Sequence, residues 1–185
     1  MSTIPEQPPY FEGVIPFHWK PNRMYRVYVL PQELVFIYVG SGGETQAAVA
    51  AQFGLVGALI SAAANPAKKI QQRQQQLDTA QFDQLVADHK HNFRAPAAEL
   101  TDISIDPRST WLAVMFSQPQ HVGVLRFTHA AQGKLRLCFN TVEDMQVAVE
   151  CLPVALGHQV AVNVEWDQQK GKFVKRLSGE GGFGN

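Results

Sequence analysis

The earliest regular pattern along the chain is a pair of apolar runs whose side chains alternate with a period of two. Residues 24–30 and 34–39 are rich in β-branched and aromatic side chains, and Pro31 opens the short segment between them. Such runs around a proline-containing turn predict a β-hairpin. In its first strand the alternation places on one face Met24, Arg26, Tyr28 and Leu30, and on the other Tyr25, Val27 and Val29.

A second group of strand-like runs follows Arg94. The runs cover residues 99–106, 111–116, 122–128 and 134–140. Their close spacing predicts an antiparallel meander. In the first of these runs Leu100 is out of phase with Ile103 and Ile105, which share one face. In the last run the alternation directs inward Leu135, Leu137 and Phe139, and directs outward Lys134, Arg136 and Cys138.

The meander leads into an amphipathic helix over residues 141–157. Thr141, with Asp144 three positions later, is typical of a helix N-cap, and Gly157 is typical of a C-cap. Apolar side chains recur with helical spacing at Met145, Val149, Leu152 and Leu156. We expect the first three of these to be buried, and we expect Pro153 to kink the last turn.

A different pattern occupies residues 45–67, where no side chain is charged. The helical period separates a bulky stripe, formed by Val49, Phe53, Val56 and Ile60, from a nearly opposite small-residue face, formed by Ala50, Gly54, Gly57, Ala58 and Ser61. The segment is long enough to cross a bilayer, which takes about 20 residues. However, it has few bulky apolar residues, and its polar positions, such as Gln46 and Asn65, oppose insertion.

The remainder of this region is polar and then helical again. A glutamine-rich run with basic residues covers 68–76, and a short helix is predicted after Asp78. That helix would carry on one side Phe82, Leu85, Val86 and His89.

Composition limits the classes of function. The chain has 185 residues, 16 Lys and Arg against 16 Asp and Glu, and a 45% apolar content, which suits one compact domain with an embellishment. The zero net charge disfavours a dedicated nucleic-acid-binding protein. Two cysteines are too few for a disulfide framework, and the first residues lack a signal-peptide pattern, so we expect a cytoplasmic protein.

The order of these patterns resembles a known family. Residues 133–157 look like the closing unit of pleckstrin-homology-like (PH-like) domains, in which the last strand leads through a capping Ser or Thr and acidic residues into the helix that plugs the barrel. Residues 24–39 and 97–106 resemble early strands of bacterial PH-like and GRAM-type domains. The similarity spans about residues 23–157 and rests on pattern rather than on motif residues.

The resemblance implies an α+β fold class, mainly antiparallel β: a PH-like split barrel of about seven strands closed by a C-terminal helix. In a departure from a minimal PH domain, which lacks it, a helical insertion over residues 44–92 would lie between strands 2 and 3. A proline-rich N-terminal arm, residues 1–22, would pack its aromatic side chains on the domain, and residues 158–185 would form a C-terminal hairpin or tail.

One departure from the family concerns phosphoinositides. Phosphoinositide-binding PH domains have basic residues around the first hairpin loop, whereas residues 31–33 here include no cation. Arg26 is the nearest, and one arginine does not make a polyphosphate site. We therefore expect no binding of a phosphoinositide headgroup.

Motifs that suggest other chemistry have simpler structural explanations. Residues 179–184 match G-x-G-x-x-G as a string but precede no helix, so they do not predict a dinucleotide site. His89 and His91 would point about 200° apart on a helix, so they could share a metal ion only if the helix ended there. Cys138 and Cys151 have no zinc-ligand spacing, and only Arg136 is placed to activate Cys138.

Three functional hypotheses follow. The first is a non-catalytic binding or scaffold module that self-associates, or binds a protein partner, through its helical insertion, because small residues permit close approach of a second backbone. The second is a peripheral membrane module at the inner membrane face, with basic residues near the headgroups. The residues assigned to these contacts are Ala50, Phe53, Gly54, Gly57, Ala58, Ser61, Lys68, Lys69 and Arg73.

The third hypothesis is an enzyme whose site is assembled from residues scattered along the sequence. No G-x-S-x-G or H-E-x-x-H motif occurs, and nothing in sequence brings a histidine or nucleophile to Asp102 and Asp106. We therefore expect no catalytic residues, no cofactor and no metal site, and we expect a homo-oligomer or protein partner rather than nucleic acid.

Overall fold

A computed structural model describes residues 8–17, 21–41, 82–108 and 121–176 of the chain. The strands are β1 (Tyr10–Ile15), β2 (Arg23–Leu30), β3 (Glu33–Ser41), β4 (Phe93–Pro96), β5 (Leu100–Pro107), β6 (Gly123–His129), β7 (Gly133–Phe139), β8 (Val160–Val162), β9 (Val164–Asp167) and β10 (Lys172–Lys175). The helical segments are α3 (Phe82–Ala87) and α5 (Val142–Leu156), with single 3-10 turns η1 (Ala97–Glu99) and η2 (Gly157–Gln159). The protein is therefore an α+β protein built mainly of antiparallel strands.

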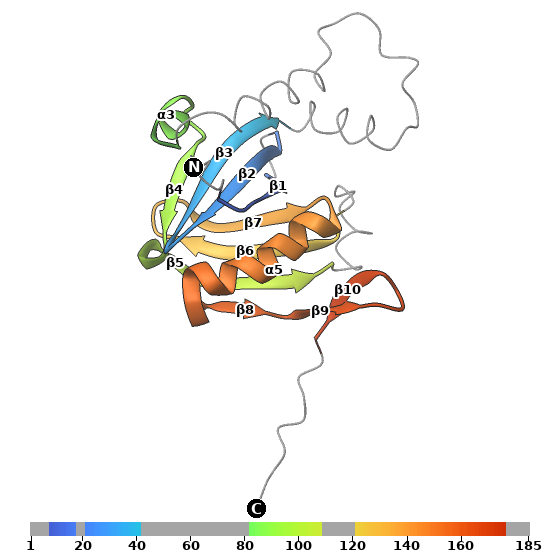
Figure 1. The fold of residues 1–185 in the computed structure, drawn as a ribbon. Coiled ribbons are helices and arrows are strands. Elements are labelled where there is room, and N and C mark those ends of the chain that lie inside the picture. The colour runs from blue at the N-terminus through green and yellow to red at the C-terminus, as the bar shows by residue number, and fades with distance from the viewer. Residues whose placement is uncertain (1–7, 18–20, 42–81, 109–120, 177–185) are drawn as a thin grey trace, which may run out of the picture.

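Eight of the strands form one sheet in the order β4-β3-β2-β1-β7-β6-β5-β8, and β9 pairs with β10 in a separate two-stranded sheet. Two antiparallel meanders, β1–β4 and β5–β7, are joined where β1 pairs with β7. Figure 1 shows β2 and β3 running at a steep angle to β6 and β7, with α5 lying across the second meander. Among the described residues the edge strands β4 and β8 do not pair with each other, so the sheet is open and is not a closed barrel.

One hydrophobic core lies between α5 and the inner faces of both meanders. Its buried members include Val27 and Phe36 from the first meander, Leu125 and Leu137 from the second, and Leu152 from α5. The hairpin predicted at residues 24–39 is confirmed, with a β-bulge between Met24 and Tyr25. Its predicted faces are also confirmed, because the inner face contributes to this core Tyr25, Val27 and Val29.

The proline-rich N-terminal segment, expected to pack on the domain as an arm, instead contributes a central strand. β1 pairs along its whole length with β2 and also pairs with β7 at Gly13 and Val14. At that junction the strands approach so closely that a Cβ on Gly13 would overlap the side chain of Leu137. Because this strand precedes the predicted hairpin, the insertion expected between strands 2 and 3 falls between β3 and β4.

The irregular phase of residues 99–106 has a structural cause. Asp102 adopts a φ of 52°, in the left-handed region, and the pairing of β5 with β6 shifts register between Thr101 and Ser104. This β-bulge brings Leu100 into the same core as Ile103 and Ile105, although simple alternation would place it on the opposite face. The predicted strands at 122–128 and 134–140 are confirmed as β6 and β7, and β5 pairs directly with β6. The strand predicted at 111–116 lies outside the described residues.

The C-terminal helix begins and ends where its caps predict. The Asp144 amide donates to Thr141 Oγ1 over 3.1 Å, and Gly157 has a φ of 73° after the last turn. Met145 and Leu152 are buried as expected, but Val149 is only half-buried, because Ala148 faces the core in its place. The helix continues through Pro153 to Leu156.

The C-terminal segment divides differently from the expected hairpin. Residues 160–162 join the large sheet as β8, which pairs in parallel with β5, and only β9 and β10 form a hairpin. The division falls at Asn163, whose amide donates to the Ile105 carbonyl and whose side chain donates to Asp106. Residues 158–162 therefore belong to the main domain rather than to a tail.

Candidate functional site

The residues predicted to contact a partner all belong to the insertion. The small-residue face, Phe53 and the three basic residues Lys68, Lys69 and Arg73 lie outside the described residues. The candidate site is therefore built from the part of the domain that adjoins this segment, namely the outer side of β1–β3 together with α3.

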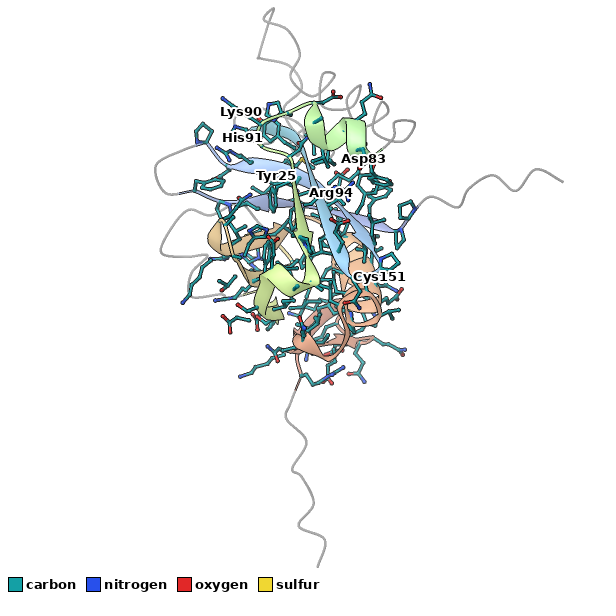
Figure 2. All side chains as sticks on the ribbon, turned by 90° about the vertical axis from the view of Figure 1, so that its left-hand side faces the viewer. Tyr25, Asp83, Lys90, His91, Arg94 and Cys151 are labelled. Atoms are coloured by element: carbon teal, nitrogen blue, oxygen red, sulfur yellow. The ribbon has the colours of Figure 1, made fainter. Side chains whose placement is uncertain are left out.

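The outer side of β1–β3 is mostly apolar. We call it the outer apolar face and define it by the buried side chains Val14, Met24, Tyr28, Val35, Ile37 and Val39. Its members alternate along the strands with the inner residues, as the period of two requires. The described residues that pack against it are Leu30 and three side chains of α3, Phe82, Leu85 and Val86. Figure 2, which looks onto the molecule from the left-hand side of Figure 1, shows α3 near the upper end of β4, with Asp83 of α3 and Arg94 of β4 labelled.

An ion pair is embedded in the outer apolar face. Arg26 on β2 lies directly opposite Glu12 on β1, and its Nη2 and Nε atoms are 2.8 and 2.9 Å from the same carboxylate oxygen. The two side chains are only 5% and 14% exposed. The guanidinium also lies 4.2 Å from the centre of the Tyr10 ring, a cation–π contact. Burial acts to lower the pKa of Arg26, but Glu12 and Tyr28 outweigh it and raise that pKa above its ordinary value.

Short polar links hold α3 beside the face. Arg94 on β4 donates to Glu33 over 2.7 Å and also pairs with Asp83 in the first turn of α3. Asn92 accepts from the Tyr38 amide over 2.7 Å and donates to the Leu85 carbonyl. The six-residue helix is thereby fixed to both β3 and β4, with Leu85 directed at the sheet.

The condition under which His89 and His91 could share an ion is partly met. Because α3 ends at Ala87, the two imidazole rings are brought to 5.0 Å between their centres. Both rings contact Tyr38, which stacks on His89 at 4.7 Å. In the part of the chain that the structure describes, no group of three or more His, Cys, Asp and Glu side chains is arranged to hold a metal. The arrangement is an aromatic cluster at the end of α3.

The structure does not support the hypothesis that Arg136 activates Cys138 as a nucleophile. Cys138 lies on the outer side of β7 as predicted, but it is buried, and burial raises the pKa of its thiol more than the nearby Arg136 lowers it. Burial also raises the pKa of the half-buried Cys151. Both are free thiols. A raised pKa leaves little thiolate at neutral pH, so neither position is an activated nucleophile.

The two aspartates considered for catalysis have structural partners. Asp106 pairs with Arg126 over 3.2 Å and accepts hydrogen bonds from Ser104 and Asn163. Asp102 accepts a hydrogen bond from Thr128 on the neighbouring strand. These contacts fix the polar outer side of β5 and β6.

Sequence reasoning did not single out His121 and His129, the two buried histidines at opposite ends of β6. His129 is fully partnered: its Nε2 lies 3.3 Å from the Arg94 carbonyl, and its Nδ1 accepts from the amides of Ala131 and Gln132. Nδ1 of His121 forms no hydrogen bond of normal geometry among the described residues, although the nearby Gly123 backbone acts to raise the pKa of this ring. For His129 the available signal was its position beside the Gly-containing turn at residues 131–133. For His121 the sequence holds no such signal.

Comparison with protein-family profiles, curated proteins and solved structures found no match to this chain. Within the described ranges, none of the helices is long and apolar enough to cross a membrane.

Proposed function

We propose that the chain is a non-catalytic PH-like binding or scaffold module that self-associates through its helical insertion. Several features support the PH-like split barrel. A four-stranded and a three-stranded meander are joined through β1 and β7, and the last strand leads through a Thr cap into a core-packed helix. Counting β1, the seven strands β1–β7 precede α5, which is the number that the resemblance implies.

The outer apolar face is the observation that carries the binding function. The described domain already has a core on the inner side of the sheet, which α5 covers. A second cluster on the opposite side of the same strands is more than the fold of one such domain requires, since the outer side of a sheet normally carries polar residues. An apolar sheet face of this kind has to be covered by another element, and its side chains are buried within the single chain, so we propose that the face is where the insertion sits.

The position of the insertion connects it to this face. The chain leaves β3 at Ser41, two residues beyond Val39, and returns at Phe82, whose ring lies 4.6 Å from that of Tyr28. Both Val39 and Tyr28 belong to the outer apolar face. We propose that the helix predicted at residues 45–67 places its bulky stripe on this face and its small-residue face against a second subunit.

Sedimentation velocity of a matched pair of variants tests this function. Gly54→Leu/Ala58→Leu adds bulk to the small-residue face, and Val49→Leu/Val56→Leu adds the same residue type to the opposite stripe. We expect the wild type and the second variant to sediment as oligomers and the first as a monomer. Equal sedimentation of both variants, or a wild type that remains monomeric, would overturn the proposal.

Peripheral membrane attachment is the second candidate. The protein would then be cytoplasmic and bind the inner face of the membrane, with Lys68, Lys69 and Arg73 near the lipid headgroups. The same samples, mixed with liposomes of anionic lipid, distinguish it. Partitioning of the wild type onto the liposomes, lost when these three residues are replaced by glutamine, would favour this candidate over self-association.

The expectation that no phosphoinositide binds now rests on charge balance alone. Residues 31–33 join β2 to β3, which is the second hairpin, whereas the first hairpin is connected by residues 16–22 and includes Lys20. With a net charge of zero, we still propose neither phosphoinositide nor nucleic acid as partner. An enzymatic role is the least supported, and a screen of ester, phosphate and nucleotide substrates tests it.

A further inference from the structure

The β9–β10 hairpin projects from the edge of the domain. It is a two-stranded sheet of its own, and Figure 1 shows it extending past the end of β8. Its base is fixed, because the Arg176 amide donates to the Asn163 carbonyl over 2.9 Å. Its turn is fixed as well, because the carboxylate of Asp167 accepts from the amides of Gln169 and Lys170. The hairpin is therefore an ordered projection rather than a tail.

An aromatic pair lies next to the turn of this hairpin. Trp166 on β9 is directly opposite Phe173 on β10, and the two rings meet edge to face with 5.2 Å between their centres. Phe173 packs against the core, and Val164, two residues before the tryptophan, is buried. Trp166 itself is 44% exposed and is the largest exposed apolar side chain among the described residues. The hairpin thus holds an apolar ring in place at the surface.

The charge on the hairpin is positive. Of the 16 basic and 16 acidic residues of the chain, residues 163–176 hold four and two respectively. Among these four cations only Lys170 has an acidic partner in the described part of the chain, namely Asp167 at 2.9 Å. The other three cations are exposed and are Lys172, Lys175 and Arg176. The hairpin is therefore locally cationic in a chain whose net charge is zero.

We propose that the β9–β10 hairpin contacts the surface of a bilayer that contains anionic lipid. A tryptophan with an apolar body and a polar N–H suits the headgroup level of a membrane, and the three exposed cations complement the negative surface potential. A projecting hairpin with one exposed ring can meet such a surface without a groove. Single-stranded nucleic acid suits it less, because that ligand takes successive aromatic rings along a cationic groove. The contact is independent of the insertion and of the function proposed above.

Co-sedimentation of the full chain with phosphatidylcholine vesicles, with and without phosphatidylserine, tests the contact at low salt. We expect binding only to the vesicles that contain phosphatidylserine. Lys172→Gln/Lys175→Gln should weaken this binding by about fivefold for each cation removed. The matched control Lys90→Gln/Lys134→Gln removes two exposed lysines that lie on other elements and should change the affinity much less.

A further variant separates this contact from membrane attachment through the insertion. Lys68→Gln/Lys69→Gln/Arg73→Gln leaves the hairpin intact and should bind the anionic vesicles nearly as well as the wild type. Loss of binding in this variant, together with normal binding in Lys172→Gln/Lys175→Gln, would overturn the proposal in favour of the insertion.

Fluorescence quenching reports where the ring lies. Lipids brominated on their acyl chains quench a tryptophan that enters the bilayer, and the chain has three tryptophans. We expect quenching of the wild type that is largely lost in Trp166→Phe, a conservative variant that keeps an aromatic ring opposite Phe173.

Three results would overturn the proposal. They are a wild type that does not bind the anionic vesicles, equal binding to vesicles without phosphatidylserine, and quenching that is unchanged in Trp166→Phe. Displacement of the chain from the vesicles by a single-stranded oligonucleotide that binds it more tightly would do so too, and would identify nucleic acid as the partner of the hairpin. Self-association is measured without lipid, so its test is unaffected by any of these results.

Discussion

The two meanders of the large sheet share one core but differ on their outer sides. On β1–β3 the outer side chains are mostly apolar and buried, as the outer apolar face shows. On β5–β7 the corresponding positions include Ser104, Asp106, Arg126, Thr128 and Arg136. The inner sides are alike, since both feed the same core beneath α5. The difference shows that the inner residues build the shared core, whereas the outer residues of the first meander form a second buried apolar layer. We propose that this layer supports the insertion.

The outer sides of the two meanders also differ in how their arginines are paired. Arg26 lies on the outer apolar face and is fully engaged by Glu12 and the Tyr10 ring. Arg136 lies on the polar outer side and has no acidic partner among the described residues. A buried charge requires compensation, which Glu12 supplies for Arg26, whereas the half-buried Arg136 remains partly open to solvent.

The largest effect is expected from breaking the ion pair of the first meander. Glu12→Ala leaves the guanidinium of Arg26 buried without its carboxylate and should lower the free energy of unfolding by about 3–5 kcal/mol. Arg126→Ala, at a pair whose arginine is 49% exposed, should cost less than about 1 kcal/mol. Urea denaturation measures both, and equal losses would contradict the contrast between the two outer sides.

A substitution in the shared core beneath α5 should destabilise both meanders together. Leu152→Ala removes a fully buried side chain of α5 and should lower the free energy of unfolding by about 2–5 kcal/mol. Val154→Ala, on the same helix but 85% exposed, should change it by less than about 0.5 kcal/mol. If thermal unfolding of the Leu152 variant showed two separate transitions, the idea of one core beneath both meanders would have to be abandoned.

A smaller effect is expected where α5 meets the first meander. Thr141 caps the helix, and the neighbouring Asp144 accepts from the Glu12 amide of β1 over 2.7 Å. Thr141→Ala should lower the free energy of unfolding by about 0.5–2 kcal/mol through loss of the cap. Thr101→Ala, at an exposed strand position, is the matched control. A Thr141 variant as stable as this control would show that the cap does not contribute.

The substitution of His121 should have the smallest effect on the free energy of unfolding at neutral pH, and its effect should appear only as the pH falls. The pKa of His121 is lowered from 6.5 to about 4, so protons bind more readily to the unfolded chain than to the folded one in that interval. The stability contributed by neutral His121 is therefore complete above about pH 6.5 and is lost as the pH falls toward 4. Unfolding free energies of the wild type should decline more steeply over this range than those of His121→Gln. Parallel curves would mean that the imidazole is not buried as the structure has it.

The elements with strong periodicity could be predicted from the sequence. The hairpin at residues 24–39, the strands β6 and β7, and α5 with its Thr141 and Gly157 caps all depend on local patterns. β1 could not, because its six residues lie between prolines, and its Gly13 is explained only by the approach of Leu137 from a strand far away in sequence. The bulge at Asp102 was visible only as a broken alternation.

The candidate sites were predictable to different degrees. The outer apolar face follows from the alternation along the hairpin, although Val14 becomes part of it only through the pairing of β1. The contact between His121 and Arg136 joins residues 15 positions apart that share no motif. Whether an arginine on a strand finds a carboxylate depends on tertiary placement, so the contrast between the buried Arg26 and the half-buried Arg136 required the structure.

The most direct test of the central claim, that the chain associates with itself through the insertion beside the outer apolar face, is sedimentation equilibrium of the full chain without lipid. We predict an average mass that rises with loading concentration from that of one subunit to a whole multiple of it. A mass that stays at one subunit up to the highest soluble concentration would contradict the claim.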